Sequence, residues 1–328
     1  MPEAFGRYDG KTPTRPTART ESDTLSLALL VIEIPWSPNI GHIGGLLLTW
    51  HGLFTAVGIL AGVQISLRMA KVVHYDEDDA YTLALVGVPS GIIGARLLFV
   101  VEHWDFYGQN PGQILALTEG GISIWGAVIG GVAGGFAFAI WRGYNIGRGL
   151  DIAAFGLILG MAIGRIGDLI NGEHIARATD LPWGVIYTNP DSPAFAHSLA
   201  VGAHHPATTY ELLGDLVILG LLFVALLRWF PRRPGITFFV FFIGYAVMRF
   251  FLTYLRVDSA STFGLRVPQL VSLVVVLASL PPLWWFWRQP PEAPPGQATT
   301  SETGRVSVPV RSARGTTGRR AGRRAGDR

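Results

Sequence analysis

Four polar side chains lie close together in the stretch GMAIGRIGDLINGE, residues 160–173, which begins as an apolar helix: Arg165, Asp168, Asn171 and Glu173. Charged groups at the edge of a membrane are costly, so each of them needs a partner or a function. Arg165 and Asp168 are three residues apart, a spacing that lets them share one helix face and pair. A packing face with one internal salt bridge would explain the stretch alone. A second arginine inside an apolar span, Arg249, favours a functional site instead.

Arginine suits phosphate because its planar guanidinium group binds two oxygens and stays protonated. Arg96, Arg165 and Arg249 occur in three separate apolar runs, and Tyr245 adds a hydroxyl four residues before Arg249. Such a set can hold a phospholipid headgroup and stabilise a departing phosphate. For any one arginine, pairing with a carboxylate or capping a carbonyl is an equally good explanation. For the set, a binding site for an anionic lipid is the better one.

His51 follows a tryptophan at the start of an apolar run, where a histidine can act as a general base near neutral pH. An interfacial histidine bonded to a backbone carbonyl would look the same. The chain has no cysteine, which excludes disulfides and any thiol nucleophile of its own. We find no metal-ligand spacing, no phosphate-binding glycine loop and no nucleic-acid motif. We therefore predict neither a cofactor, nor a metal, nor a nucleic-acid partner.

Composition and apolar run length define the class of protein. Only 15% of the residues are charged and 49% are hydrophobic, against about 25% charged in soluble domains. Runs of about 20 apolar residues predict membrane-spanning helices. We expect an all-α polytopic membrane protein with seven transmembrane helices, at residues 46–69, 80–101, 121–141, 149–170, 208–230, 235–255 and 265–287.

Composition shifts divide the chain into three parts. We expect a disordered leader over residues 1–23, a transmembrane domain over 24–289 and a disordered, arginine-rich tail over 290–328. Residues 25–35 are apolar but too short to span, and predict a segment lying against the membrane. Residues 171–206, polar and rich in proline, predict a small head with a strand at WGVIY.

Basic residues concentrate in every second predicted loop. These loops lie between spans one and two, three and four, and five and six, and the last basic segment follows span seven. The positive-inside rule makes that side cytoplasmic. The N-terminus and the head then face outward, and the C-terminal tail is cytoplasmic.

Several motifs occur in an order that resembles the prolipoprotein diacylglyceryl transferase (Lgt) family. GRIGDLINGE at 164–173 is similar to the usual GRIGNFINGE of that family. Further similarity lies in GARLLFVVEHWDFYGQNPGQIL, GGISIWGAVIGG, HPATTYELL, YAVMRF and FGLRVPQLVSL. The resemblance covers about residues 46–287.

This resemblance implies a bacterial cytoplasmic-membrane enzyme that moves diacylglyceryl from phosphatidylglycerol to the cysteine thiol of a preprolipoprotein lipobox. The products are a thioether and glycerol phosphate, with no cofactor, and we expect a monomer surrounded by membrane lipid. Arg165 and Arg249 would bind the phosphate and stabilise the leaving group. Asn171, Gly172 and Glu173 would shape a polar pocket to which Arg96 contributes. Tyr245 would hydrogen-bond lipid or substrate.

The chain departs from the family pattern at four positions. Asp168 replaces an asparagine, His51 a tyrosine, Trp125 a candidate catalytic histidine and Thr253 a glutamate. Tryptophan cannot accept a proton, so we hypothesise that His51 or Asp168 partly replaces the missing base. An Lgt-like paralogue with another lipid or acceptor, or a non-catalytic lipid-binding or transport protein, would also be compatible. The absence of internal repeats counts against a transporter.

Overall fold

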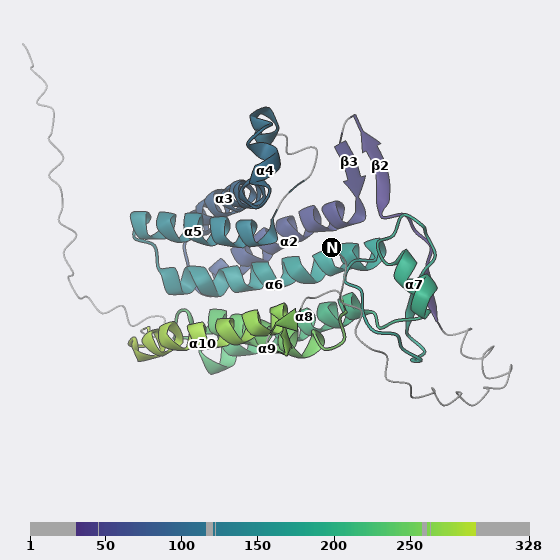
Figure 1. Cartoon of the computed structure of the whole chain (residues 1–328). Helices are drawn as coiled ribbons and strands as arrows, with labels where there is room; N and C mark the ends of the chain where they lie inside the picture. Colours follow the sequence, from purple (N-terminus) through teal and green to yellow (C-terminus); the bar gives the residue numbers. More distant parts are fainter. Residues whose placement is uncertain are drawn as a thin grey trace, which may run out of the picture. The chain divides into compact units, whose positions relative to one another are not determined.

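A computed structural model describes residues 31–44, 46–115, 121, 123–257, 261–262 and 264–292 (Figure 1). Five helices in this part of the chain are long and apolar enough to cross a membrane, and two shorter apolar helices accompany them. The protein is therefore a polytopic, mostly helical membrane protein. The seven apolar helices are α2 (Trp50–Val72), α3 (Glu77–Glu102), α5 (Ile124–Arg142), α6 (Ile146–Asn171), α8 (Ala207–Val224), α9 (Ile236–Leu252) and α10 (Val267–Arg288).

Strands explain two of the differences from the predicted bounds. Leu46–Thr49 forms strand β3, which pairs antiparallel with β2 (Asn39–Ile43), so the first helix starts at Trp50 and not at residue 46. Similarly, Leu265–Arg266 is strand β6, paired with β5 (Ser261–Thr262), and α10 begins only at Val267. Thr49 ends the hairpin and caps α2, because its hydroxyl accepts a hydrogen bond from the Gly52 backbone N–H.

Helix α6 lies between two groups of helices (Figure 1). It packs on α2 on one side and on α8 and α9 on the other. Glycines allow the α2–α6 contact, since a Cβ at Gly58 would lie 2.7 Å from the Gly160 carbonyl oxygen, and one at Gly62 would lie 2.5 Å from that of Gly156. This close approach brings the start of α2 beside the end of α6, where the candidate residues lie.

The α3–α5 pair is also held together by glycines, and this predicts a sharp difference between two substitutions. A Cβ at Gly94 would lie 2.4 Å from the Gly126 carbonyl oxygen, whereas one at Gly135 would meet no atom within 4 Å. We expect Gly94→Ala to destabilise the protein by about 1–3 kcal/mol through overpacking. Gly135→Ala should leave the thermal unfolding midpoint in detergent unchanged or slightly raised. Equal midpoints for both variants would contradict this packing.

Buried aliphatic and aromatic side chains form the core between α6, α8 and α9. Phe155, Ile158 and Leu222 are fully buried, and the rings of Phe155 and Phe223 meet edge to face. After α8, a π-helical turn, η3 (Ala225–Trp229), ends the helix. At the far end of α6 from residue 171, Asp151 accepts hydrogen bonds from the backbone N–H groups of Gly235 and Phe238 and so fixes the start of α9.

The segment between α6 and α8 forms the predicted head, with strand β4 (Val185–Tyr187) within WGVIY and a short helix α7 (Phe195–Val201). Strand β1 (Ile32–Ile34) pairs with β4 in parallel, so residues 32–34 form part of the head. That this segment lies against the membrane stays a prediction. Residues 25–30 lie outside the described part. The head is tied to α6 because the Tyr187 hydroxyl donates to the Leu169 carbonyl (2.6 Å). Burial lowers the pKa of His204 to about 4, which keeps this head histidine neutral at neutral pH.

The predicted leader lies outside the described residues, as does the tail beyond residue 292. The last described residue, Glu292, is held by α6: its carboxylate accepts from the buried Arg148 guanidinium at 2.5 Å and from the Asn145 side chain at 3.3 Å. The chain is thus fixed to α6 just after α10 ends. The predicted domain boundaries themselves stay predictions.

Candidate functional site

The fully buried carboxylate of Glu211, on α8, contacts three arginines. Glu211 forms ion pairs with Arg165 from α6 (3.0 Å), with Arg256 from the segment after α9 (3.2 Å) and with Arg249 from α9. A buried carboxylate is tolerated only when it is paired and hydrogen-bonded, and here three different segments supply the partners. Glu211 therefore joins α6, α8 and α9 at one point.

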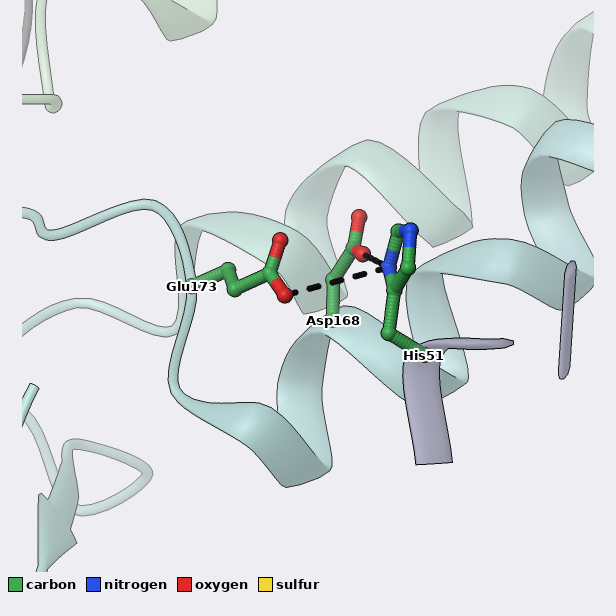
Figure 2. A group of neighbouring side chains, drawn as sticks. All are labelled: His51, Asp168 and Glu173. Atoms are coloured by element: carbon green, nitrogen blue, oxygen red, sulfur yellow. Dashed lines mark hydrogen bonds and ion pairs between the residues drawn. The ribbon is translucent and has the colours of Figure 1, made fainter. Parts of the chain in front are cut away.

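Asp168 is the second centre of the network. Its Oδ1 accepts from His51 Nδ1 at 2.6 Å (Figure 2). Its Oδ2 accepts from Arg165 Nη1 at 2.9 Å, so the predicted Arg165–Asp168 pair is present. The His51 contact crosses from α2 to α6. It is possible because Gly167 lies against the backbone of His51, where a Cβ would come within 2.7 Å of the His51 Cα.

His174, directly after the end of α6, connects the two carboxylates. Its Nδ1 accepts a hydrogen bond from Arg256 Nη2 at 2.7 Å. Its Nε2 lies 3.2 Å from Arg165 Nη1 and 3.4 Å from Asp168 Oδ2. His174 adopts a positive φ of 66°, uncommon for a residue other than glycine. The contacts with Arg256, Arg165 and Asp168 hold it in this position.

Three guanidinium groups, on Arg165, Arg249 and Arg256, are concentrated in this network; all three pair with Glu211, and Arg165 also pairs with Asp168. The carboxylates of Glu173 and Asp215 lie near the same groups. The guanidinium groups lie near the ends of apolar helices. Such a site favours a monoanion with oxygen atoms that can accept several N–H groups, as a phosphodiester does.

The end of α6 shapes the outer side of the network. Gly172 adopts a left-handed φ of 79°, which ends the helix, and a Cβ there would lie 2.2 Å from Ser192 Oγ. The Asn171 side chain donates to Glu173 Oε1 at 3.1 Å. Glu173 Oε1 in turn lies 3.9 Å from His51 Nδ1 (Figure 2). Gly172 thus directs the chain so that Glu173 turns back towards His51.

His51, Asp168 and Glu173 offer ligand atoms within 4.8 Å of one another, and they come from two distant parts of the chain. Both oxygens of Asp168 already have partners, and the Arg165 guanidinium is one of them. A cation would meet that positive charge directly. We therefore interpret the group as a hydrogen-bonded network.

Arg96 has partners in a different part of the chain. Its guanidinium donates to the backbone carbonyls of Gln113 (2.6 Å), Ile114 (2.7 Å) and Gly121 (2.8 Å), and it lies over the Tyr107 ring. It therefore fixes the loop that follows α3, including the short helices α4 (Trp104–Tyr107) and η1 (Pro111–Leu115). This loop connects α3 to α5.

The structure brings together most of the candidates predicted from sequence. Arg165, Arg249, Asp168 and His51 belong to one network, and the Tyr245 hydroxyl accepts from Arg165 Nη2 at 3.4 Å. The Thr253 hydroxyl donates to the Arg249 carbonyl, and the carboxylate that pairs with Arg249 comes from α8.

Sequence reasoning missed three members of the network: Glu211, Arg256 and His174. Glu211 lies near the start of an apolar helix, where a carboxylate facing water is equally reasonable from sequence. Arg256 lies one residue beyond the predicted sixth span. The spacing of seven residues between Arg249 and Arg256 is two helical turns, a periodicity that indicates a shared face.

Fold and site together define a polytopic membrane protein with a network of arginines, carboxylates and histidines at one end of its helices. The family model described as prolipoprotein diacylglyceryl transferase matches residues 38–285. Relatives named phosphatidylglycerol–prolipoprotein diacylglyceryl transferase include one from Gloeobacter violaceus, 36% identical over 77% of this chain and 93% of its own length. A relative from Clostridioides difficile is 33% identical over 72% of this chain and 90% of its own length. One from a Nostoc species is 32% identical over 85% of this chain and 100% of its own length. The chain belongs to the prolipoprotein diacylglyceryl transferase family, and it is a membrane transferase of lipoprotein biosynthesis.

Proposed function

We propose that this chain transfers the diacylglyceryl group of phosphatidylglycerol to the cysteine thiol of a preprolipoprotein lipobox. The glycerol carbon that bears the phosphate forms a bond to sulfur, and its bond to the phosphate oxygen breaks. The products are a thioether and glycerol phosphate. The observation that carries this proposal is the gathering of three arginines around one buried carboxylate.

Arg165 and Arg249 are proposed to bind the phosphate and to stabilise the negative charge that grows on it as the carbon–oxygen bond breaks. Both are partly exposed, with 13% and 18% of their side chains accessible, so an anion can reach them. Tyr245 is proposed to hydrogen-bond the lipid. His51 and Asp168 are proposed to serve the proton transfer from the thiol.

The other predicted binding residues are proposed to shape the site. Asn171, Gly172 and Glu173 form its outer rim at the end of α6. Arg96 is proposed to contribute to substrate binding through the loop whose carbonyls it holds.

The finer topology is also a proposal. All seven apolar helices are proposed to span the bacterial cytoplasmic membrane, with the head and the N-terminus outside and the C-terminus in the cytoplasm. The concentration of basic residues in every second loop supports this orientation. The site then lies on the outer side, where a translocated lipobox cysteine arrives, and we propose that the protein works as a monomer.

Purified protein in lipid vesicles tests the proposed function. With phosphatidylglycerol labelled in its acyl chains, we expect the label to move to a lipobox peptide and glycerol phosphate to appear in equal amount. A peptide with serine in place of cysteine should remain unlabelled, because an alcohol is a far weaker nucleophile than a thiolate. No transfer by folded, reconstituted protein would contradict the proposal. Transfer from another phospholipid alone would instead indicate an altered donor.

A further inference from the structure

The transfer needs a group that removes the proton of the thiol, because the thiolate and not the thiol is the nucleophile. Few of the described side chains near the arginines can take that proton. Glu211 is occupied by three arginines, and Asp168 by His51 and Arg165. Both ring nitrogens of His174 face charged partners. The atoms of these groups that could accept a proton already have partners within the network.

Asp215 is a buried carboxylate on α8, one turn beyond Glu211. It is fully buried, and neither of its oxygens accepts a hydrogen bond from the described residues. A peptide thiol cannot reach a carboxylate that has no exposed surface. This leaves His51 and Glu173, whose side chains are 45% and 34% exposed.

The geometry of His51 distinguishes it from Glu173. Its Nδ1 makes the 2.6 Å hydrogen bond to Asp168 Oδ1, and the longer contact to Glu173 ends on the same nitrogen (Figure 2). Within the described chain, Nε2 has no hydrogen-bond partner. A carboxylate that accepts from Nδ1–H fixes the neutral tautomer in which Nε2 carries the free lone pair. Asp168 therefore leaves His51 with one accessible nitrogen in the form that accepts a proton.

We propose that His51 is the base that removes the thiol proton through Nε2, and that Asp168 is the positioning residue that fixes its tautomer and stabilises the imidazolium. This rests on the proposed function. The S–H proton moves to Nε2, the thiolate forms the S–C bond, and the C–O electron pair leaves with the phosphate. The imidazolium then returns its proton to the departing phosphate or to water, so that protons and charge balance without any further reactant.

His51 and Asp168 act together, because they contact each other across α2 and α6. A histidine without the carboxylate would lack a fixed tautomer, and the carboxylate without the histidine would only pair with Arg165 and His174.

Variants at both positions, assayed with the labelled phosphatidylglycerol and a lipobox peptide, test the proposal. His51→Ala should lower kcat by about 10²–10⁴-fold, the usual contribution of a general base. Free imidazole should restore part of the rate. Asp168→Asn should lower kcat with little change in KM, and the double variant should be no slower than His51→Ala, because the two residues act as a unit. His42→Gln, at an exposed histidine of β2, is the matched control and should match the wild type.

The pH profile separates a base from a structural histidine. Arg165, Asp168, Glu173 and His174 are the charged or titratable groups around His51. In the wild type kcat/KM should fall on the acidic side as the base is protonated, and this limb should be absent in His51→Ala. An unchanged limb in His51→Ala that disappears in Glu173→Gln would overturn the assignment in favour of Glu173. Loss of wild-type activity with a chelator, restored by a divalent cation, would overturn it in favour of a metal.

The outcomes for the two proposals are distinguishable. An inactive wild type contradicts the proposed function itself. An active wild type with an equally active His51→Ala contradicts only the proposed base.

Discussion

Replacing Arg165 by lysine is expected to lower the rate of diacylglyceryl transfer by about 10²–10³-fold, the usual effect of removing one preorganised donor to a developing anion. Arg165 holds Asp168 through Nη1 at 2.9 Å and Glu211 through Nη2 at 3.0 Å. Lysine keeps the positive charge but has one nitrogen, and it cannot reach both carboxylates and a phosphate. The measurement is kcat with labelled phosphatidylglycerol, together with the thermal unfolding midpoint.

Arg148→Lys is the matched control for this prediction. Arg148 is also a buried arginine of α6, but it lies at the other end of the helix and binds Glu292. It should affect the unfolding midpoint without reducing the rate of the folded protein. Equal rates for Arg165→Lys and the wild type would show that only the charge matters, and would remove Arg165 from the transition state.

Much of this arrangement can be predicted from the sequence, because the length of an apolar run indicates whether it forms a membrane-spanning helix. Every predicted span contains a helix, and the head lies between the fourth and fifth apolar helices as expected. The errors occur where apolar residues form strands. Leu46–Thr49 is as hydrophobic as the helix that it precedes, so hydropathy alone does not distinguish the two, and the strand Leu265–Arg266 is only two residues long. The head strand β1 was missed because its partner β4 lies about 150 residues away in the sequence.

The site was predictable only in part, for a different physical reason. Arg165 and Asp168 lie within one helical turn, so their pairing follows from local geometry. Glu211 has no local partner, and its role depends on α6, α8 and α9 converging on it. The carboxylate expected beside Arg249 at position 253 is supplied from α8 instead. Pairings across helices depend on packing, which a single sequence does not reveal.

The convergence on Glu211 predicts the largest effect on stability. Glu211→Gln should destabilise the protein by about 3–5 kcal/mol, because it leaves three arginines without their shared carboxylate. Asp215→Asn is the matched control on the same helix: its carboxylate is also fully buried but accepts no hydrogen bond from the described residues. The control should change the free energy of unfolding by less than about 1 kcal/mol. Thermal unfolding in detergent measures both.

Anion binding gives the same pair of variants a second measurement. Glu211→Gln removes the one carboxylate that pairs with all three guanidinium groups, so these groups carry more uncompensated positive charge. An anion that binds the folded state stabilises it in proportion to its affinity. Inorganic phosphate should therefore raise the unfolding midpoint of Glu211→Gln more than that of the wild type or Asp215→Asn. Equal shifts in all three proteins would mean that the arginines around Glu211 do not form the anion site.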